Sequence, residues 1–319
     1  MPRMRVLRRT VIALVLGVLV LEGALRALGL YLTKTFEANL KAAQETKDCV
    51  TILTLGESTT GGLYVNGHDS YPRQLERRLR LRYGRPVCTI TPIHFGQNTS
   101  QMYKRFDRYM TTFKPRLVVF MCGANNTWSL EESNIGSFID LTNPDALGLR
   151  LRLTLDRSRV FKLARMAKYD LDGWRKAAKD DLSGRAQYTP WPPPDENVEF
   201  GTRNQKAFLA LWAYEVGHMI DTARSQGVPS ILMTYPNYHF PPVSAFEELA
   251  AAKQIPLVRN DLMFQPLLAS DAAAHKYFFP DRGHPREIGY AMMAAEVARV
   301  IEEKDLLRLE GSTASNPPR

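Results

Sequence analysis

The stretch "LTLGESTTGG", residues 53–62, joins an apolar run to a cluster of glycines and hydroxyl side chains. The apolar run predicts a buried β-strand that ends at Gly56. An acid, Glu57, and a hydroxyl, Ser58, then follow directly at the end of that strand. Glycine and serine are also common in ordinary turns, so this stretch alone does not establish a site. The question is which other residues gather around Ser58.

The rest of the chain predicts apolar strands that alternate with helices. The expected strands are 49–55, 87–95, 116–122, 229–235 and 256–260, and the expected helices are 71–83, 101–113, 204–225 and 285–302. Continuous apolar strands separated by helices are typical of a parallel sheet covered on both faces. Right-handed crossovers then predict an α/β fold, a three-layer α/β/α sandwich around a five-stranded parallel sheet.

Composition and charge favour a globular protein and exclude several functions. The chain of 319 residues is 45% hydrophobic and 24% charged, with a net charge of +9. Part of that charge comes from Arg3, Arg5, Arg8 and Arg9, ahead of the first apolar run. Because no basic stripe interleaved with aromatic residues follows, we expect no nucleic-acid partner. The three cysteines and six histidines are widely spaced, so we expect neither a metal site nor a cofactor.

The N-terminal segment predicts a membrane anchor. Residues 10–21 carry no charge, and the apolar character continues to residue 32, interrupted only by Glu22 and Arg26. At about 1.5 Å per helical residue, residues 10–32 reach roughly 34 Å, enough to cross a bilayer. The arginines before this run place residues 1–9 in the cytoplasm and the remainder outside it. A cleaved signal peptide is the alternative, but no small-x-small cleavage motif follows the run.

Polar residues and glycines follow the predicted strands at four places. They are Gly56-Glu57-Ser58, then Gly96 and Asn98 in "FGQNTS", then "GANN" at 123–126, and finally "DRGHP" at 281–285. In doubly wound folds, ligands bind at the carboxyl ends of the strands. These residues include a nucleophile, oxyanion donors, a base and an acid to orient it, which are the groups that acyl transfer needs.

The four motifs, in this order, resemble the sequence blocks of the SGNH (GDSL-type) serine hydrolases. Glu57 stands where the family usually has Asp, and Asn126 stands where its third block ends in Asp; Asp281, His284 and Pro285 match the last block. The resemblance covers about residues 49–302. It implies a flavodoxin-like five-stranded sheet in a hydrolase domain at 49–305, within a membrane-anchored bacterial branch. We expect a linker at 33–48, an insertion at about 140–201 and a disordered tail at 306–319.

The resemblance also implies the role of each site residue. Ser58 is the expected nucleophile, His284 the base, and Asp281 the acid that orients the imidazole. The expected oxyanion donors are the amides of Ser58 and Gly96 and the side chain of Asn125. Four further residues are candidates for the pocket: Glu57, Asn98, Asn126 and Tyr235. An alternative interpretation makes Asp281 and His284 part of a helix N-cap, since an acid before a proline-initiated helix is a common helix start.

The expected protein is a single-pass serine esterase of the inner membrane, with its catalytic domain on the periplasmic side. Its expected substrates are O-acyl groups, above all O-acetyl groups, on an envelope or secreted glycan. The alternatives are a lysophospholipase, a thioesterase, an O-acyltransferase, or a non-catalytic binding or assembly protein with the same fold. The insertion, rich in Arg, Lys, Leu and Trp, is either a lid or a surface that lies on membrane headgroups.

The cysteines allow one disulfide bond. In the sheet order that the resemblance implies, Cys49 and Cys88 open two neighbouring parallel strands, and an oxidising compartment favours a bridge between them. Two free thiols are the alternative, because adjacent parallel strands are awkward for disulfide geometry. Cys122 is expected to stay free and buried.

Overall fold

In a computed structural model of the chain, the described residues are 2–45, 49–93, 96–140, 145–164, 167, 203–237, 240–279 and 283–308. They belong to two compact units. One consists of residues 1–39 and 140–195, and the other of residues 40–139 and 196–319.

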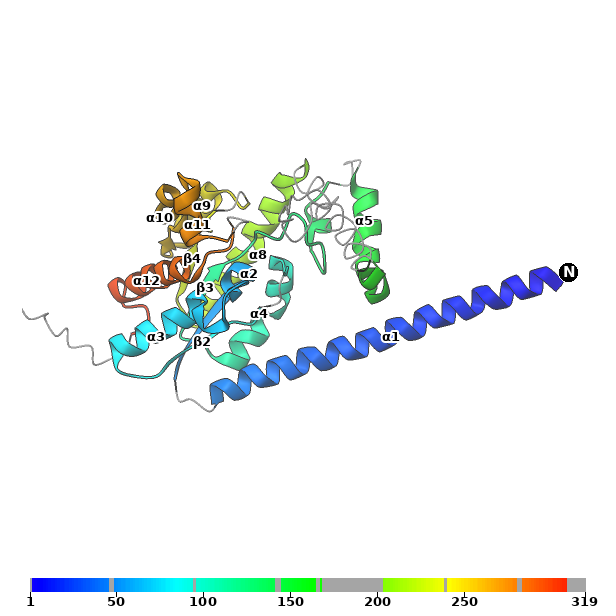
Figure 1. Cartoon of the computed structure of the whole chain (residues 1–319), viewed down its shortest axis with the longest axis horizontal. Coiled ribbons are helices and arrows are strands. Elements are labelled where there is room, and N and C mark those ends of the chain that lie inside the picture. The colour runs from blue at the N-terminus through cyan, green and yellow to red at the C-terminus, as the bar shows by residue number, and fades with distance from the viewer. Residues whose placement is uncertain are drawn as a thin grey trace, which may run out of the picture. The chain divides into compact units, whose positions relative to one another are not determined.

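The larger unit is built on one parallel sheet (Figure 1). Its strands are β1 (Val50–Gly56), β2 (Val87–Ile90), β3 (Leu117–Met121), β4 (Ser230–Met233) and β5 (Leu257–Val258). They lie in the order β2-β1-β3-β4-β5, which is the flavodoxin-like order, and every pair is parallel. The order reverses between β1 and β3, so the carboxyl ends of these two strands flank the switch point where such folds bind ligands. The predicted fold class is confirmed.

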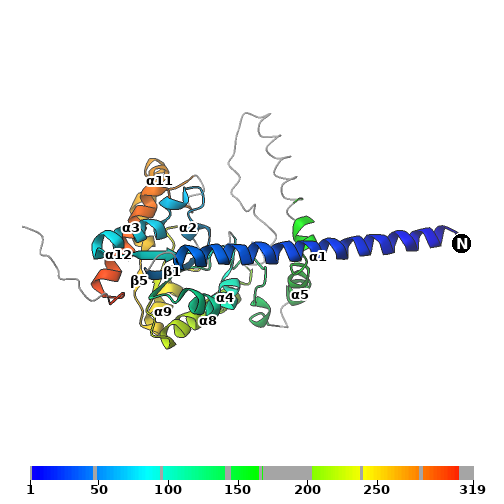
Figure 2. The ribbon, with the colours of Figure 1, turned by 90° about the horizontal axis from the view of Figure 1, so that it is seen from below.

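Helices cover both faces of the sheet (Figure 2). On one face lie α3 (Tyr71–Tyr83) and α12 (Glu287–Glu303); on the other lie α4 (Thr99–Phe113), α8 (Gln205–Ser225) and α9 (Val243–Lys253). Each long helix buries an apolar stripe, such as Leu75 and Leu79 of α3. The shorter elements are α2 (Ser58–Gly61), α10 (Asn260–Phe264), α11 (Asp271–Tyr277), η1 (Gly67–Asp69), η2 (Ile135–Ser137) and η3 (Gln265–Leu268).

Several boundaries differ from the sequence-based expectations for identifiable reasons. Strand β2 ends at Ile90 rather than at residue 95, and Pro92, which has no N–H to donate, follows closely. Helix α4 begins two residues earlier than expected because Asn98 and Gln101 form a capping box at its start. Residues 306–308 were predicted as part of a disordered tail, but Leu307 is buried in the core. Residues 309–319 lie outside the described residues.

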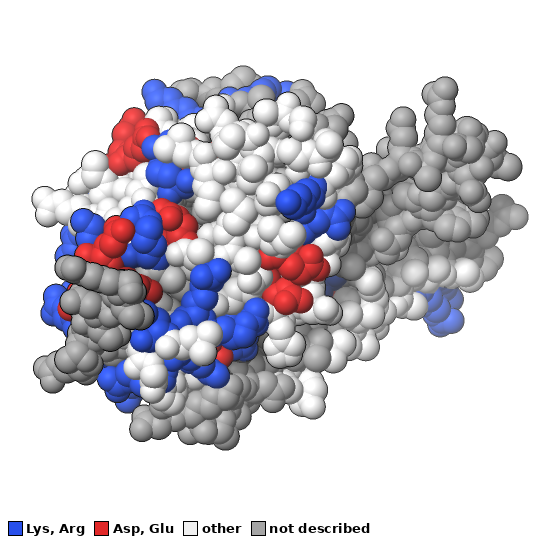
Figure 3. Space-filling view, turned by 60° about the vertical axis from the view of Figure 1, so that its left-hand side comes forward, with Lys and Arg blue, Asp and Glu red and all other residues white. Residues whose placement is uncertain are grey.

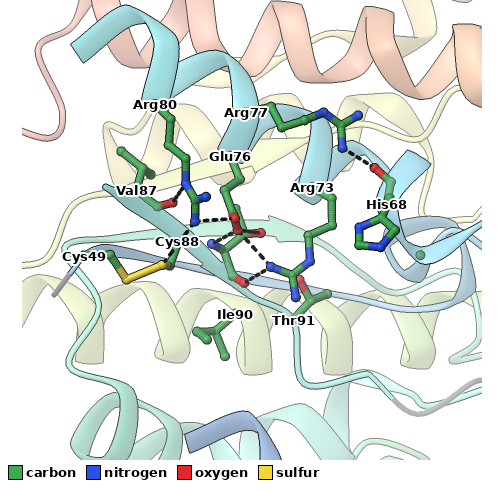
Figure 4. A network of polar contacts seen from close by, with 12 residues as sticks. Cys49, His68, Arg73, Glu76, Arg77, Arg80, Val87, Cys88, Ile90 and Thr91 are labelled. Carbon is green, nitrogen blue, oxygen red and sulfur yellow. Dashed lines mark hydrogen bonds and ion pairs between the residues drawn. A yellow bond between two sulfur atoms is a disulfide. The ribbon is translucent and has the colours of Figure 1, made fainter. Parts of the chain in front are cut away.

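A disulfide bond joins Cys49 to Cys88 at the amino ends of β1 and β2, with Cα atoms 5.8 Å apart. Beside it, the buried carboxylate of Glu76 on α3 forms ion pairs with Arg73 and Arg80 and accepts a hydrogen bond from the Thr89 amide of β2 (Figure 4). These contacts attach α3 to the edge strand at the end of the sheet opposite to Ser58. Cys122 is free and buried, as predicted.

The smaller unit contains α5 (Asp145–Leu155) and the part of α1 (Pro2–Glu45) up to residue 39. Within α1, the segment Arg5–Tyr31 is long and apolar enough to cross a membrane, with a mean hydropathy of 2.3 and none of its residues buried. Residues 33–45, predicted as a polar linker, continue the same helix. Most of the insertion, residues 141–144, 165–166 and 168–202, lies outside the described residues.

Candidate active site

Ser58 stands where β1 ends, as the first residue of α2. Gly56 ends β1 without adopting a left-handed φ, so a glycine is needed here for another reason. A Cβ at Gly56 would lie 2.5 Å from the carbonyl oxygen of Met121 and 1.9 Å from the hydroxyl of Thr60. A glycine is therefore required for space, and it lets β1 run against β3 up to the half-buried Ser58.

His284 reaches Ser58 from the segment that precedes α12. The Ser58 hydroxyl and the His284 Nε2 atom are 2.8 Å apart, although 226 residues separate them in the sequence. A backbone hydrogen bond holds His284 in place: the Phe279 amide donates to the His284 carbonyl at 2.9 Å. The N-cap of α12 is Arg286, so the interpretation of His284 as a capping residue is wrong. Asp281 lies outside the described residues.

Two aromatic side chains flank the histidine. Tyr64 meets the His284 ring edge-on at 5.3 Å between centroids, and Phe279 packs against Tyr64 at the same separation. The Tyr64 side chain is 43% exposed, so an apolar ring lies at the surface next to the Ser58–His284 pair. Sequence reasoning missed Tyr64, because no motif surrounds it and its left-handed φ of 74° has no signature in the sequence.

Glu57 is a buried carboxylate that supports the turn after β3. Its Oε1 atom accepts a hydrogen bond from the Gly123 amide at 2.6 Å, and the Tyr235 hydroxyl donates to Oε2. Tyr235 in turn accepts a hydrogen bond from the Ala124 amide at 3.1 Å. Burial raises the pKa of Glu57 from 4.5 to about 7, although the bonds from Tyr235 and Gly123 act in the opposite direction.

Hydrogen bonds also join the loops that follow β1, β2 and β3. The Asn125 side-chain amide donates to the Gln97 carbonyl at 2.9 Å, and the Gln97 side chain donates to the Gly56 carbonyl at 2.6 Å. The backbone at Gly96 has a φ of +75°, which favours glycine. Hydrogen bonds thus connect three of the motifs that the sequence predicted, those at Gly56, Gly96 and Asn125. Gln97 was not identified from the sequence, although its place between Gly96 and Asn98 was a signal.

Asn98 and Asn126, predicted as pocket residues, are each only 1% exposed and are bonded to neighbouring loops. Asn98 caps α4, and its side chain also donates to the carbonyls of Ser129 and Glu131. The Asn126 side chain accepts from the Thr99 amide at 2.9 Å and donates to the Thr99 hydroxyl at 2.7 Å. Both asparagines hold the loops beneath the site.

Tyr235 has two environments. Its hydroxyl belongs to the Glu57 network, whereas the residue also lines a pocket with Pro236, Asn237, Pro241 and Phe246. A Cβ at Gly123 would lie 2.9 Å from Pro241, so this pocket adjoins the turn that carries Asn125. Tyr235 thus lines a pocket next to this turn and also supports Glu57; its place in a substrate pocket stays a prediction.

Within the described residues, the charges away from Ser58 do not indicate a second centre. Among the described residues, no three His, Cys, Asp or Glu side chains are grouped so that they could hold a metal ion. On the face drawn in Figure 3, basic and acidic side chains lie next to one another. Helix α12 gives an example of such neighbouring charges, because Arg299 forms ion pairs with both Glu296 and Glu303.

Comparison with known proteins gives a family. A search of curated protein sequences finds no match. Solved structures with a related fold include the acetylxylan esterase Axe2 from Geobacillus stearothermophilus (15% identity, 79% of this chain and 93% of that chain covered, TM-score 0.47). They also include the lipase/acylhydrolase from Enterococcus faecalis (15% identity, 80% and 96% covered, TM-score 0.45) and the psychrotrophic esterase EstA from Pseudoalteromonas sp. (13% identity, 80% and 98% covered, TM-score 0.42).

The family model of the GDSL-like lipases/acylhydrolases matches residues 54–292, which is well over half of the chain. The match spans the segment from β1 to α12 and includes both Ser58 and His284. The chain is a serine ester hydrolase that belongs to the GDSL-like lipase/acylhydrolase family.

Proposed function

We propose that this chain is a membrane-anchored serine esterase that acts outside the cytoplasm on O-acyl groups, above all O-acetyl groups, of an envelope or secreted glycan. The observation that carries the proposal is the 2.8 Å contact between the Ser58 hydroxyl and His284 Nε2 at the switch point of the sheet. A serine hydroxyl needs an adjacent base before it can attack an ester, and this contact supplies one.

In the proposed mechanism, His284 Nε2 takes the proton of Ser58 as Oγ attacks the ester carbonyl carbon. The tetrahedral intermediate collapses, and the protonated His284 gives its proton to the leaving alcohol. The acyl group then remains on Ser58 until water, activated by the same imidazole, releases the acid. Asp281, three residues before His284, is proposed to orient the imidazole and to stabilise the imidazolium.

The oxyanion of that intermediate requires hydrogen-bond donors. We assign the donors to the backbone amides of Ser58 and Gly96 and to the side chain of Asn125. The Asn125 amide has two N–H groups, and its bond to the Gln97 carbonyl fixes its orientation through one of them. A preorganised donor of this kind stabilises the transition state by about 2.7–4 kcal/mol.

The first part of the chain supports the proposed compartment. Residues 10–32, most of which lie in the apolar helical segment Arg5–Tyr31, supply the proposed anchor, and the arginines that precede residue 10 favour a cytoplasmic N-terminus. The Cys49–Cys88 disulfide supports an oxidising environment for the catalytic unit, such as the periplasm. A reporter that is active only outside the cytoplasm, fused after Arg319, tests this orientation. Release of a shortened soluble form would identify a cleaved signal instead.

The proposed substrate class is supported by the side chain of Tyr64. The exposed Tyr64 ring beside His284 offers a flat apolar surface, which suits the face of a sugar. The same surface could pack against a longer acyl chain of a lysophospholipid or a thioester. Comparing acetylated glycan oligomers with lysophospholipids and acyl thioesters as substrates decides between these classes. Adding a sugar acceptor distinguishes hydrolysis from acyl transfer.

The activity is tested with p-nitrophenyl acetate on the full chain in detergent. Ser58→Ala and His284→Ala should each lower the rate by a factor of about 10⁴ to 10⁶ while the disulfide and the secondary structure persist. Ser225→Ala is the matched control, because this exposed serine ends α8 ahead of the amino end of β4. Full activity of Ser58→Ala would refute the mechanism, and an inactive wild-type chain would favour a binding protein.

A further inference from the structure

A charged pair inside the apolar segment of α1 is bonded to residues of the insertion. Glu22 Oε1 accepts a hydrogen bond from Arg26 at 2.7 Å, and Glu22 Oε2 accepts from the Ser158 hydroxyl and from the Val160 amide, both at 2.9 Å. Arg26 donates in addition to the Arg157 carbonyl at 2.7 Å, across 131 residues of sequence. Both members of the pair therefore bind the turn at residues 157–160, which we call the docking turn.

These contacts matter because a charged side chain in the hydrocarbon region is expensive unless other groups satisfy it. The pairing between Glu22 and Arg26 alone satisfies only one oxygen of the carboxylate. The docking turn supplies an amide and a hydroxyl for the other oxygen, and an acceptor for a second guanidinium nitrogen. The docking turn therefore lies at the depth of Glu22 along the anchor.

That depth can be worked out from helix geometry. From Arg9 to Glu22 the helix rises about 20 Å at about 1.5 Å per residue. If the hydrocarbon core, about 30 Å thick, begins at Arg9, then Glu22 lies roughly 10 Å inside its outer edge. Interfacial helices bury their apolar faces about 5–10 Å into the boundary between headgroups and acyl chains. The docking turn thus reaches the level at which an interfacial helix is found.

Helix α5, which immediately precedes the docking turn, has an exposed apolar stripe. Leu147, Leu151 and Leu155 are spaced by four residues and are 80%, 61% and 39% exposed, whereas Leu149 on the same helix is buried. Residues spaced by four lie on one face of a helix, so the three leucines form a continuous row. The exposed Arg150 accompanies this row and suits anionic lipid headgroups.

From these observations we infer that α5 and the docking turn lie in the outer leaflet of the membrane beside the anchor, with Leu147, Leu151 and Leu155 among the acyl chains. The occupant of the apolar stripe is lipid, because the stripe continues into a turn that is bonded to a membrane-spanning helix. The inference rests on the proposed anchoring of residues 10–32. It assigns to part of the insertion a role in membrane association in place of a lid over the site.

The test uses nitroxide labels on single introduced cysteines in the full chain, reconstituted in nanodiscs with anionic lipid. Native cysteines do not interfere, because Cys49 and Cys88 are bridged and Cys122 is buried. Leu151→Cys is the test position, and Leu81→Cys, an 86% exposed leucine on α3, is the matched control. Leu14→Cys reports on the anchor itself. Each label is scored by its collision rates with oxygen, which concentrates in lipid, and with a water-soluble nickel chelate.

We expect the Leu151 and Leu14 labels to collide more with oxygen than with nickel, and the Leu81 label to show the reverse. If Leu14 favours oxygen but Leu151 favours nickel, the anchor stands and this inference is wrong. If Leu14 itself favours nickel, the proposed anchoring fails. A Leu151 label shielded from both reagents would mean that a protein, such as a second copy of the chain, covers the stripe, which also refutes the inference.

A second variant tests the docking contact. Glu22→Leu removes the acceptor for Ser158 and Val160 but keeps the segment apolar. In this background the Leu14 label should stay in lipid, while the Leu151 label should shift towards nickel accessibility. Glu22→Gln, which retains an acceptor oxygen, should give a smaller shift. An unchanged Leu151 label in Glu22→Leu would show that this contact does not position α5.

Discussion

Replacing Glu57 by glutamine should change how the stability of the protein depends on pH. Glu57 is buried, and its carboxylate contacts the Gly123 amide and the Tyr235 hydroxyl. Its pKa is raised from 4.5 to about 7, chiefly by burial. Glutamine has nearly the same shape and cannot ionise, so it resembles the protonated acid at every pH.

The size and the sign of the effect follow from that pKa. One pKa unit corresponds to about 1.36 kcal/mol, so the change from 4.5 to about 7 corresponds to about 3 kcal/mol. Between these two pH values the folded chain holds a proton at Glu57 that the unfolded chain has lost. The free energy of unfolding of the wild type therefore falls as pH rises from 4.5 to 7. Relative to the wild type, Glu57→Gln should gain about 3 kcal/mol over this interval and change little outside it.

The assay is urea unfolding of the full chain in detergent, followed by tryptophan fluorescence at several values between pH 4 and 8. Trp212 is a suitable reporter, because it is fully buried and donates to the Cys122 carbonyl next to Gly123. At each pH, subtracting the free energy of unfolding of the wild type from that of the variant cancels the contributions of the other titrating groups. A difference that does not vary with pH, or that varies in the opposite direction, would refute the assignment.

Three further predictions concern the residues around the site and the sheet. Gly56→Ala should lower the free energy of unfolding by about 3 kcal/mol, because the added Cβ would overlap Thr60 and the Met121 carbonyl. Gly67→Ala is the control: a Cβ there meets open space, so the free energy of unfolding should change by less than about 0.5 kcal/mol. Thiol counting after denaturation should find one free cysteine in three, and three free thiols would exclude the bridge. Replacing Cys49 and Cys88 by serines should lower the free energy of unfolding by about 4 kcal/mol. Tyr235→Phe should raise the pKa of Glu57 further, because the hydrogen bond that it removes lowers that pKa. In the same urea assay, the fall in the free energy of unfolding should then extend to a higher pH than in the wild type.

The sequence predicted the sheet well, for a physical reason. Strands β1, β3 and β4 are buried on both faces, so their residues form short continuous apolar runs that can be recognised without tertiary information. The short helices α9, α10 and α11 were not predicted, because they lie in the long stretch between β4 and α12 where local patterns are weak. The helical continuation of α1 through residues 33–45 was also missed, since polar composition does not exclude a helix.

The site was predicted unevenly. The motifs brought Ser58 and His284 together, because each stands at the end of an element whose position the fold determines. The hydrogen bonds of Asn98 and Asn126 to neighbouring loops were not predicted, since a sequence does not show which amide faces its own loop. Tyr64 and Gln97 contribute through conformation and through contacts between distant loops, which local patterns do not encode. The role of Asp281 stays a prediction.

The most direct test of the central claim is labelling of the full chain with a fluorophosphonate, which reacts covalently with an activated serine. We expect one modified peptide, labelled at Ser58, because His284 Nε2 lies 2.8 Å from its hydroxyl. His284→Ala should slow the labelling strongly, and Ser58→Ala should abolish it. Labelling of another serine, or undiminished labelling of Ser58 in the His284→Ala variant, would contradict the account.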